Sequence, residues 1–145
     1  MNFEYLDPEK NDENDMNTDE EFIKQFRAVQ NTAHTINREN GWWNQRFQTL
    51  VILKEQGVDY CPNLAIELIG LCHTELSEAV EAARKHRKQS WADAKTKDTM
   101  VRELAGTIVR IMDMAEFFEL PLAEAILEEI KANAQRGYMH GGKKA

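Results

Sequence analysis

Hydrophobic residues recur at helical spacing along most of the chain, and short polar breaks separate the segments that carry this pattern. In the first segment, apolar positions three or four residues apart run from Phe22 to Ile36 and stop before the pair Asn40–Gly41. A second, shorter apolar segment opens at Trp42 and closes at Gly57. The pattern predicts a helix over each of these two segments.

Two longer apolar stripes follow, and they predict the main helices. Pro62 suits the first turn of a helix that runs to about residue 87. A helix over 99–118 comes next, and Pro121 begins a last one that ends near residue 134. The residues expected to point inward from 99–118 are Val101, Leu104, Ile108, Ile111, Met112 and Ala115. No segment alternates in the manner of a strand, so the fold class expected is all-α, a four- to five-helix bundle.

The charge of the chain is concentrated at its N-terminus. Residues 1–20 hold eight acidic residues and one lysine, whereas 17 acidic and 17 basic residues balance from residue 21 onward. We therefore expect a flexible acidic tail over 1–20 and one folded domain over 21–145. Thr18 and Glu21 have capping-box spacing, which predicts that the first helix begins near Asp19.

Composition narrows the classes of function. The balanced body has no basic stripe for nucleic acid, and no apolar run is long enough to span a membrane. Cys61 and Cys72 lie in apolar surroundings without metal-ligand spacing, so we expect buried thiols. With no secretory signal at the N-terminus, the expected location is cytoplasmic.

Three acidic residues are the candidate ligands of a metal ion. Glu75 and Glu78 are three residues apart, so on a helix they share one face, and Glu103 lies in the following helix. Carboxylates gathered between helices are costly unless a cation compensates them, and Mg²⁺ and Mn²⁺ favour oxygen ligands. The alternative is that Glu75 and Glu78 simply face solvent, as Glu81 and Arg84 are expected to do.

At these residues the chain resembles the MazG-like all-α nucleoside triphosphate pyrophosphohydrolases, a superfamily that includes dimeric dUTPases and dCTP pyrophosphatases. That family carries ExxE, a gap, and then ExxD; Glu75, Glu78 and Glu103 match it. The resemblance covers about residues 21–144. It extends to His34 and Trp43 upstream, to the segments 73–79 and 110–113, and to the C-terminal residues Asn133, Arg136, Tyr138 and Lys143.

The resemblance implies a function and a division of roles. The enzyme would hydrolyse a nucleoside triphosphate to the monophosphate and pyrophosphate with Mg²⁺, or Mn²⁺, held by Glu75, Glu78 and Glu103. Glu75 would also orient or deprotonate the attacking water. The family works as dimers or dimers of dimers, so a homodimer or homotetramer is expected. The residues expected to bind substrate are His34, Trp43, Lys131, Asn133, Arg136, Tyr138 and Lys143.

Two departures from the family pattern affect this interpretation. Gly106 stands where the family has the aspartate of ExxD, and Glu129 stands where a lysine is usual, with Lys131 the nearest replacement. Asp113 lies about 10 Å further along the helix than position 106, so it cannot replace that ligand. We expect Asp113 to pair with Arg110 or with another subunit.

Two other functions remain open at this stage. Loss of the carboxylate at 106 would suit a nucleotide-binding sensor or interaction module of the same fold, whereas a helical bundle without a ligand would gain no stability from nucleotide and Mg²⁺. A ferritin-like di-iron bundle is disfavoured, because these helices have no Glu-x-x-His pair.

Overall fold

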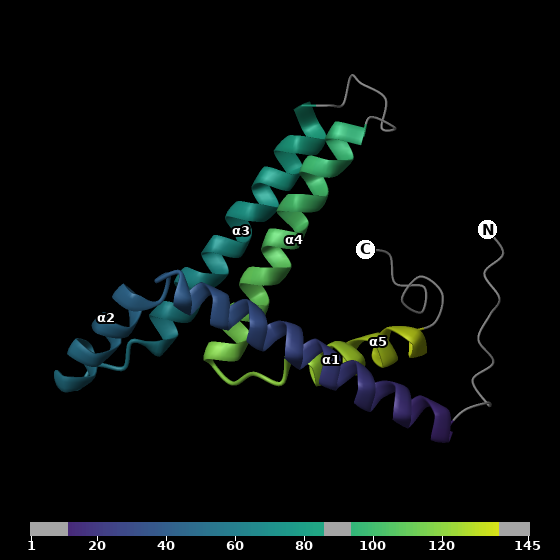
Figure 1. The fold of residues 1–145 in the computed structure, drawn as a ribbon, viewed down its shortest axis with the longest axis horizontal. Helices are drawn as coiled ribbons and strands as arrows, with labels where there is room; N and C mark the ends of the chain where they lie inside the picture. The colour runs from purple at the N-terminus through teal and green to yellow at the C-terminus, as the bar shows by residue number, and fades with distance from the viewer. Residues whose placement is uncertain (1–11, 86–93, 137–145) are drawn as a thin grey trace. The chain divides into compact units, whose positions relative to one another are not determined.

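A computed structural model describes the backbone of residues 12–85 and 94–136 and the side chains of residues 18–84 and 99–136. The described residues form five α-helices and no strand, which confirms the all-α class (Figure 1). The helices are α1 (Asp12–Glu39), α2 (Asn44–Glu55), α3 (Cys61–Lys85), α4 (Ala94–Phe117) and α5 (Leu122–Gln135).

The first helix begins earlier than its capping signal predicted. α1 starts at Asp12 rather than near Asp19, so part of the expected flexible tail is helical. The carboxylate of Asp19 binds the ammonium group of Lys131, and this long-range ion pair gives that part of α1 a tertiary contact. The capping-box signal was therefore a wrong guide to this helix start.

The predicted helix ends after α1 and α2 are confirmed, and both use glycine. Gly41 follows α1 with φ of 82°, and Gly57 follows α2 with φ of 76°. This left-handed backbone conformation carries no steric cost for a residue without Cβ. After α4, the non-glycine Glu119 takes a φ of 54°, and Pro121 then precedes the first residue of α5.

The chain divides into two compact units, which we describe separately. Unit 1 comprises Met1–Val29 and Pro121–Ala145, and it therefore contains the start of α1 and all of α5. Its described contacts include the Asp19–Lys131 pair and an ion pair between Arg27 and Glu124. These contacts join residues of α1 to residues of α5.

Unit 2, residues Gln30–Leu120, holds the hydrophobic core. α3 and α4 run side by side and antiparallel in it (Figure 1). Trp43, Leu64 and Leu68 are buried at the centre, and the Trp43 ring stacks on Phe117 with 4.4 Å between ring centroids. The partly buried apolar residues packed around them are Leu50, Tyr60, Leu71, Met114, Phe117 and Phe118.

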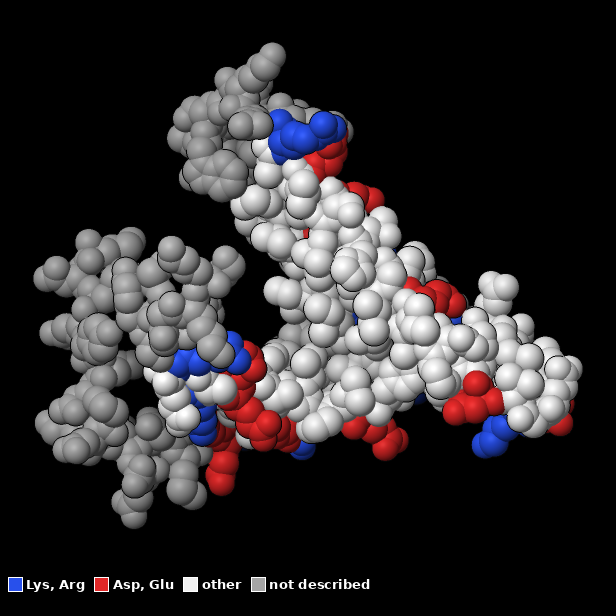
Figure 2. Space-filling model, turned by 180° about the vertical axis from the view of Figure 1, so that it is seen from behind, with Lys and Arg blue, Asp and Glu red and all other residues white. Residues whose placement is uncertain are grey.

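Several apolar residues that were expected to point inward are exposed. On α4, Met112 and Ala115 are buried as predicted, but Val101, Leu104 and Ile108 are 58%, 40% and 53% exposed. Apolar residues of the stripe predicted for α3 are also exposed, because only part of the surface of this helix packs against the rest of unit 2. Figure 2 shows a largely uncharged surface along the described part of this helix pair. The exposed apolar residues of α3 are Ile66, Ile69, Leu76 and Val80.

Two further predictions concern the cysteines and membrane-spanning segments. Cys72 is buried as predicted, but Cys61 is exposed at the first position of α3, so the prediction of a buried thiol was wrong there. Among the described helices, none combines the length and the hydropathy needed to cross a membrane.

Candidate functional site

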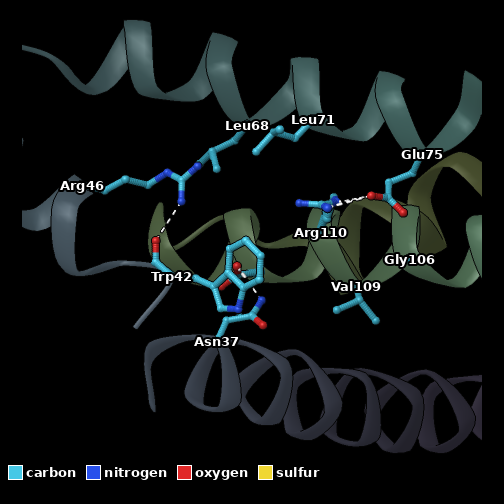
Figure 3. A pocket seen from close by; sticks show the side chains of 10 residues that line it. Asn37, Trp42, Arg46, Leu68, Leu71, Glu75, Gly106, Val109 and Arg110 are labelled. Carbon is cyan, nitrogen blue, oxygen red and sulfur yellow. Dashed lines mark hydrogen bonds and ion pairs between the residues drawn. The ribbon is translucent and has the colours of Figure 1, made fainter. Parts of the chain in front are cut away.

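Unit 2 contains a pocket of about 390 Å³ between the end of α1, the turn before α2, and the helices α3 and α4 (Figure 3). Its floor is apolar, and its polar groups include two arginines and two carboxylates. A volume of this size falls within the range of small-ligand pockets. The lining residues are Asn37, Trp42, Arg46, Leu68, Leu71, Glu75, Gly106, Val109, Arg110 and Asp113.

Glu75, the first predicted metal ligand, forms an ion pair with Arg110 across the pocket. Arg110 donates to the Oε1 atom of Glu75 from Nη2 at 2.6 Å and from Nε at 2.9 Å. The side chains are 17% exposed for Glu75 and 36% exposed for Arg110, so water screens this pair only in part. The expected pairing of Arg110 with Asp113 is therefore wrong, because the guanidinium group binds Glu75.

Gly106 provides the space in which the Glu75 carboxylate lies. A Cβ atom added at position 106 would be 2.6 Å from Oε2 of Glu75, which is too close for any Cβ contact without movement of the carboxylate. The Glu75 carboxylate thus occupies space that a side chain at position 106 would otherwise fill.

Asp113 is a hydrogen-bond acceptor for three side chains that lie far from it in sequence. His34 Nδ1 lies 2.6 Å from Oδ1, Asn37 Nδ2 donates to Oδ2 at 2.8 Å, and Trp43 Nε1 donates to Oδ1 at 2.9 Å. Because a carboxylate only accepts, His34 is the donor in this contact through Nδ1. The network ties the end of α1 and the turn that follows it to α4.

The two adjacent tryptophans have different positions. Trp43, predicted to bind substrate, is 1% exposed and packs between His34 and Phe117. Trp42 is 61% exposed and lines the pocket, and its carbonyl oxygen accepts a 2.8 Å hydrogen bond from Arg46. Substrate roles for His34 and Trp43 stay predictions; in this structure both serve the network around Asp113.

The other two predicted metal ligands differ in their exposure. Glu78 is exposed on α3, and Glu103 is half-buried on α4. Side chains of His, Cys, Asp and Glu that could hold a metal ion in a group of three or more do not occur among the described residues. With Glu75 bound to Arg110, the three glutamates do not fit a common Mg²⁺ ion in this conformation, and we derive no catalytic step through one.

The predicted substrate-binding residues at the end of α5 and directly after it belong to unit 1, and they have contacts of their own there. Lys131 binds Asp19, and Asn133 donates to Oε1 of Glu129 at 3.1 Å. Arg136 lies 3.5 Å from the same oxygen. Their roles with substrate stay predictions. Tyr138 and Lys143 lie outside the described residues.

The Cys72 thiol lies in the field of the Glu75–Arg110 pair. Burial raises the pKa of this thiol; Arg110 opposes that shift, and Glu75 adds to it. The thiol therefore stays protonated at neutral pH, and we assign it to packing rather than to nucleophilic chemistry.

None of the lining residues was among the predicted substrate contacts, and those that could contact a ligand there include Asn37, Trp42 and Arg46. One signal in the sequence points to Arg46, which is four residues after Trp42 and so one helical turn away. Nothing in the sequence separates the pocket-facing Trp42 from the core residue Trp43, since both flank the same turn.

Comparison with known proteins identifies no relative of this chain. No protein-family model matches the chain, and neither the curated proteins nor the solved structures contain a significant match. The functional interpretation therefore depends on the pocket and on the sequence resemblance described above.

Proposed function

We propose that this protein binds a nucleoside triphosphate in the pocket of unit 2 and hydrolyses it to the monophosphate and pyrophosphate. The observation that carries the proposal is the meeting of an exposed indole, Trp42, with the guanidinium groups of Arg46 and Arg110 in one cavity of about 390 Å³. The hydrolytic step is what the resemblance to MazG-like pyrophosphohydrolases implies. Its purpose would be removal of surplus or non-standard nucleotides from the cytoplasmic pool.

The lining chemistry suits the two ends of a nucleotide. A base stacked on an exposed aromatic ring contributes about 1–3 kcal/mol, and Trp42 offers such a ring at the pocket wall. Guanidinium groups bind phosphate oxygens with paired hydrogen bonds, and Arg110 uses two of its five N–H groups on Glu75. The remaining donors would serve a phosphate.

Hydrolysis in this family requires a divalent cation, and the proposal includes Mg²⁺, or Mn²⁺, as the cofactor. The resemblance assigns it to Glu75, Glu78 and Glu103, which would have to leave the arrangement described above, in which Arg110 binds Glu75. The oligomer expected from the resemblance is likewise part of the proposal, and the exposed apolar residues of α3 and α4 support it.

A nucleotide-binding module without efficient hydrolysis is the second candidate. The Glu75–Arg110 pair and the glycine at 106 favour it, because together they leave the proposed metal ligands apart. In this case the protein would bind the same ligand as a sensor or interaction partner.

The deciding experiment measures pyrophosphate release from a panel of standard and modified NTPs and dNTPs, first with Mg²⁺ and then with Mn²⁺. We expect metal-dependent release with one preferred substrate, and loss of release in Glu78→Gln with the fold intact by circular dichroism. Glu81→Gln is the matched control, since Glu81 lies on the same helix but pairs with Arg84. Unchanged turnover in Glu78→Gln would contradict the assignment.

Calorimetric titration with the same nucleotides separates the two candidates. Binding without release from any of them identifies the binding module, and Gly106→Asp should then raise hydrolysis strongly. Absence of both binding and release would overturn both candidates. A bound ligand at 100 times its dissociation constant adds about 2.7 kcal/mol to stability, which a thermal-shift measurement detects.

A further inference from the structure

The ion pair at the pocket places a positive group where the predicted site needs a metal ion. Both donors of Arg110, Nε and Nη2, converge on the single oxygen Oε1 of Glu75. Such charge-assisted hydrogen bonds are among the strong ones in proteins, and partial burial strengthens this pair further. A cation that binds Glu75 through this oxygen therefore has to displace the guanidinium group.

The second oxygen of Glu75 lies over the backbone of α4 at position 106. An added Cβ there would be 2.6 Å from Oε2 and 3.5 Å from Cδ of Glu75. Gly106 and Arg110 are four residues apart, so they lie on the same face of α4, one turn from each other. A side chain at 106 would force the Glu75 carboxylate to shift, and the other oxygen of this carboxylate is the one that meets Arg110.

We propose that Arg110 competes with a divalent cation for the Glu75 carboxylate, and that Gly106 makes the competition possible by leaving room for the pair. The site thus has a built-in positive group that lowers its affinity for Mg²⁺ and Mn²⁺. An aspartate at 106 reverses the balance, because two adjacent carboxylates repel each other until a cation lies between them. The proposal uses the pocket of the proposed function, but cation affinity is measurable without any nucleotide.

The test is a titration of the full-length protein with Mn²⁺, in which electron paramagnetic resonance measures the free ion. Arg110→Gln removes the competing charge and should tighten Mn²⁺ binding by about tenfold, as expected for loss of charge-assisted hydrogen bonds. Gly106→Asp should tighten it by about tenfold or more. Gly106→Ala adds only the Cβ atom and should give a smaller gain.

Arg84→Gln is the matched control. Arg84 also pairs with a glutamate at 2.7 Å, but this pair is exposed on α3 and involves Glu81. Mn²⁺ affinity should stay within about twofold of the wild type in this variant, since exposed pairs contribute little. Circular dichroism confirms that each variant is folded, and Gly106→Ala, which adds no metal ligand, tests the proposal even if Arg110→Gln does not fold.

Two results would overturn the competition. One is an Arg110→Gln variant, folded, whose Mn²⁺ affinity equals that of the wild type. The other is an equal gain in Arg84→Gln, which would mark a general effect of net charge. Failure of the proposed function is separate, because it shows as absence of nucleotide binding and leaves the Mn²⁺ titrations unaffected.

Discussion

At the scale of single residues, the carboxylate of Asp113 joins three side chains of unit 2 in one network. Its oxygens receive hydrogen bonds from His34, Asn37 and Trp43, all of them contributed by the end of α1 and the turn before α2. Asn37 and Asp113 also line the pocket, and Trp42 precedes Trp43 directly. Asp113 therefore holds one wall of the pocket in place.

Asp113→Asn should lower the free energy of unfolding by about 2 kcal/mol. The neutral amide is a weaker acceptor, and its NH₂ group meets donors of the surrounding network, so at least one of the charge-assisted hydrogen bonds is lost. Chemical denaturation monitored by tryptophan fluorescence measures the change. Glu21→Gln is the control on an exposed carboxylate and should stay within about 0.5 kcal/mol. Equal stability of Asp113→Asn and the wild type would contradict a structural role for the network.

The tryptophan pair offers a second prediction for single residues. Trp43→Ala should cost about 3–5 kcal/mol, because the ring is buried and stacked on Phe117. Trp42→Ala should change stability by less than about 1 kcal/mol, since this side chain is 61% exposed. Under the proposed function, Trp42→Ala should nevertheless weaken nucleotide binding about tenfold, in line with loss of one stacked base. Tighter or unchanged binding in Trp42→Ala would remove Trp42 from the site.

At the scale of the elements, the glycines show how helices end in this chain. Gly41→Ala should destabilise the protein by about 1 kcal/mol, because an alanine at a φ of 82° is strained and its Cβ would lie 3.2 Å from Asn44. Gly70→Ala is the matched comparison inside α3, where an added Cβ meets nothing within 4 Å. That variant should gain up to about 1 kcal/mol from helix propensity. Thermal unfolding of the two proteins should therefore shift in opposite directions.

The pair α3–α4 carries the pocket chemistry on one face and exposed apolar residues elsewhere. Leu68, Leu71 and Val109 contribute to the pocket, while Ile66 and Val80 are 69% and 66% exposed. Large exposed apolar patches are typical of interaction sites. The exposed apolar residues of these helices therefore lead to the prediction of self-association given below.

At the scale of the whole molecule, self-association is the prediction that follows from this surface. Wild-type protein should have the mass of a dimer or tetramer in analytical ultracentrifugation, because burial of exposed valine and isoleucine side chains contributes about 1.5–3 kcal/mol each. The double variant Val80→Lys, Ile108→Lys should shift the equilibrium toward the monomer, since buried ammonium groups are costly. Val29→Lys, which alters an exposed residue of unit 1, is the control. A monomeric wild type across the concentration series would contradict the expected oligomer.

Local patterns in the sequence determined the helices of this protein. The 3.6-residue period of apolar positions, glycines at 41 and 57, and prolines at 62 and 121 each act within a few neighbouring residues. For this reason, the helix ends that these residues predict agree with the observed ends near α2, α3 and α5. The starts of two helices differ, since α1 begins at Asp12 rather than near Asp19 and α4 begins at Ala94 rather than near residue 99.

Only the tertiary structure decided which residues meet at the pocket. Spacing placed Glu75 and Glu78 on one helix, but the partner of Glu75 in the structure is Arg110 of another helix, and its carboxylate lies beside the backbone of Gly106. The same holds for the two tryptophans, whose exposure depends on Asp113 of α4 and Phe117. Helical periodicity is a property of neighbours along the chain, whereas ion pairing and burial depend on residues that only folding brings together.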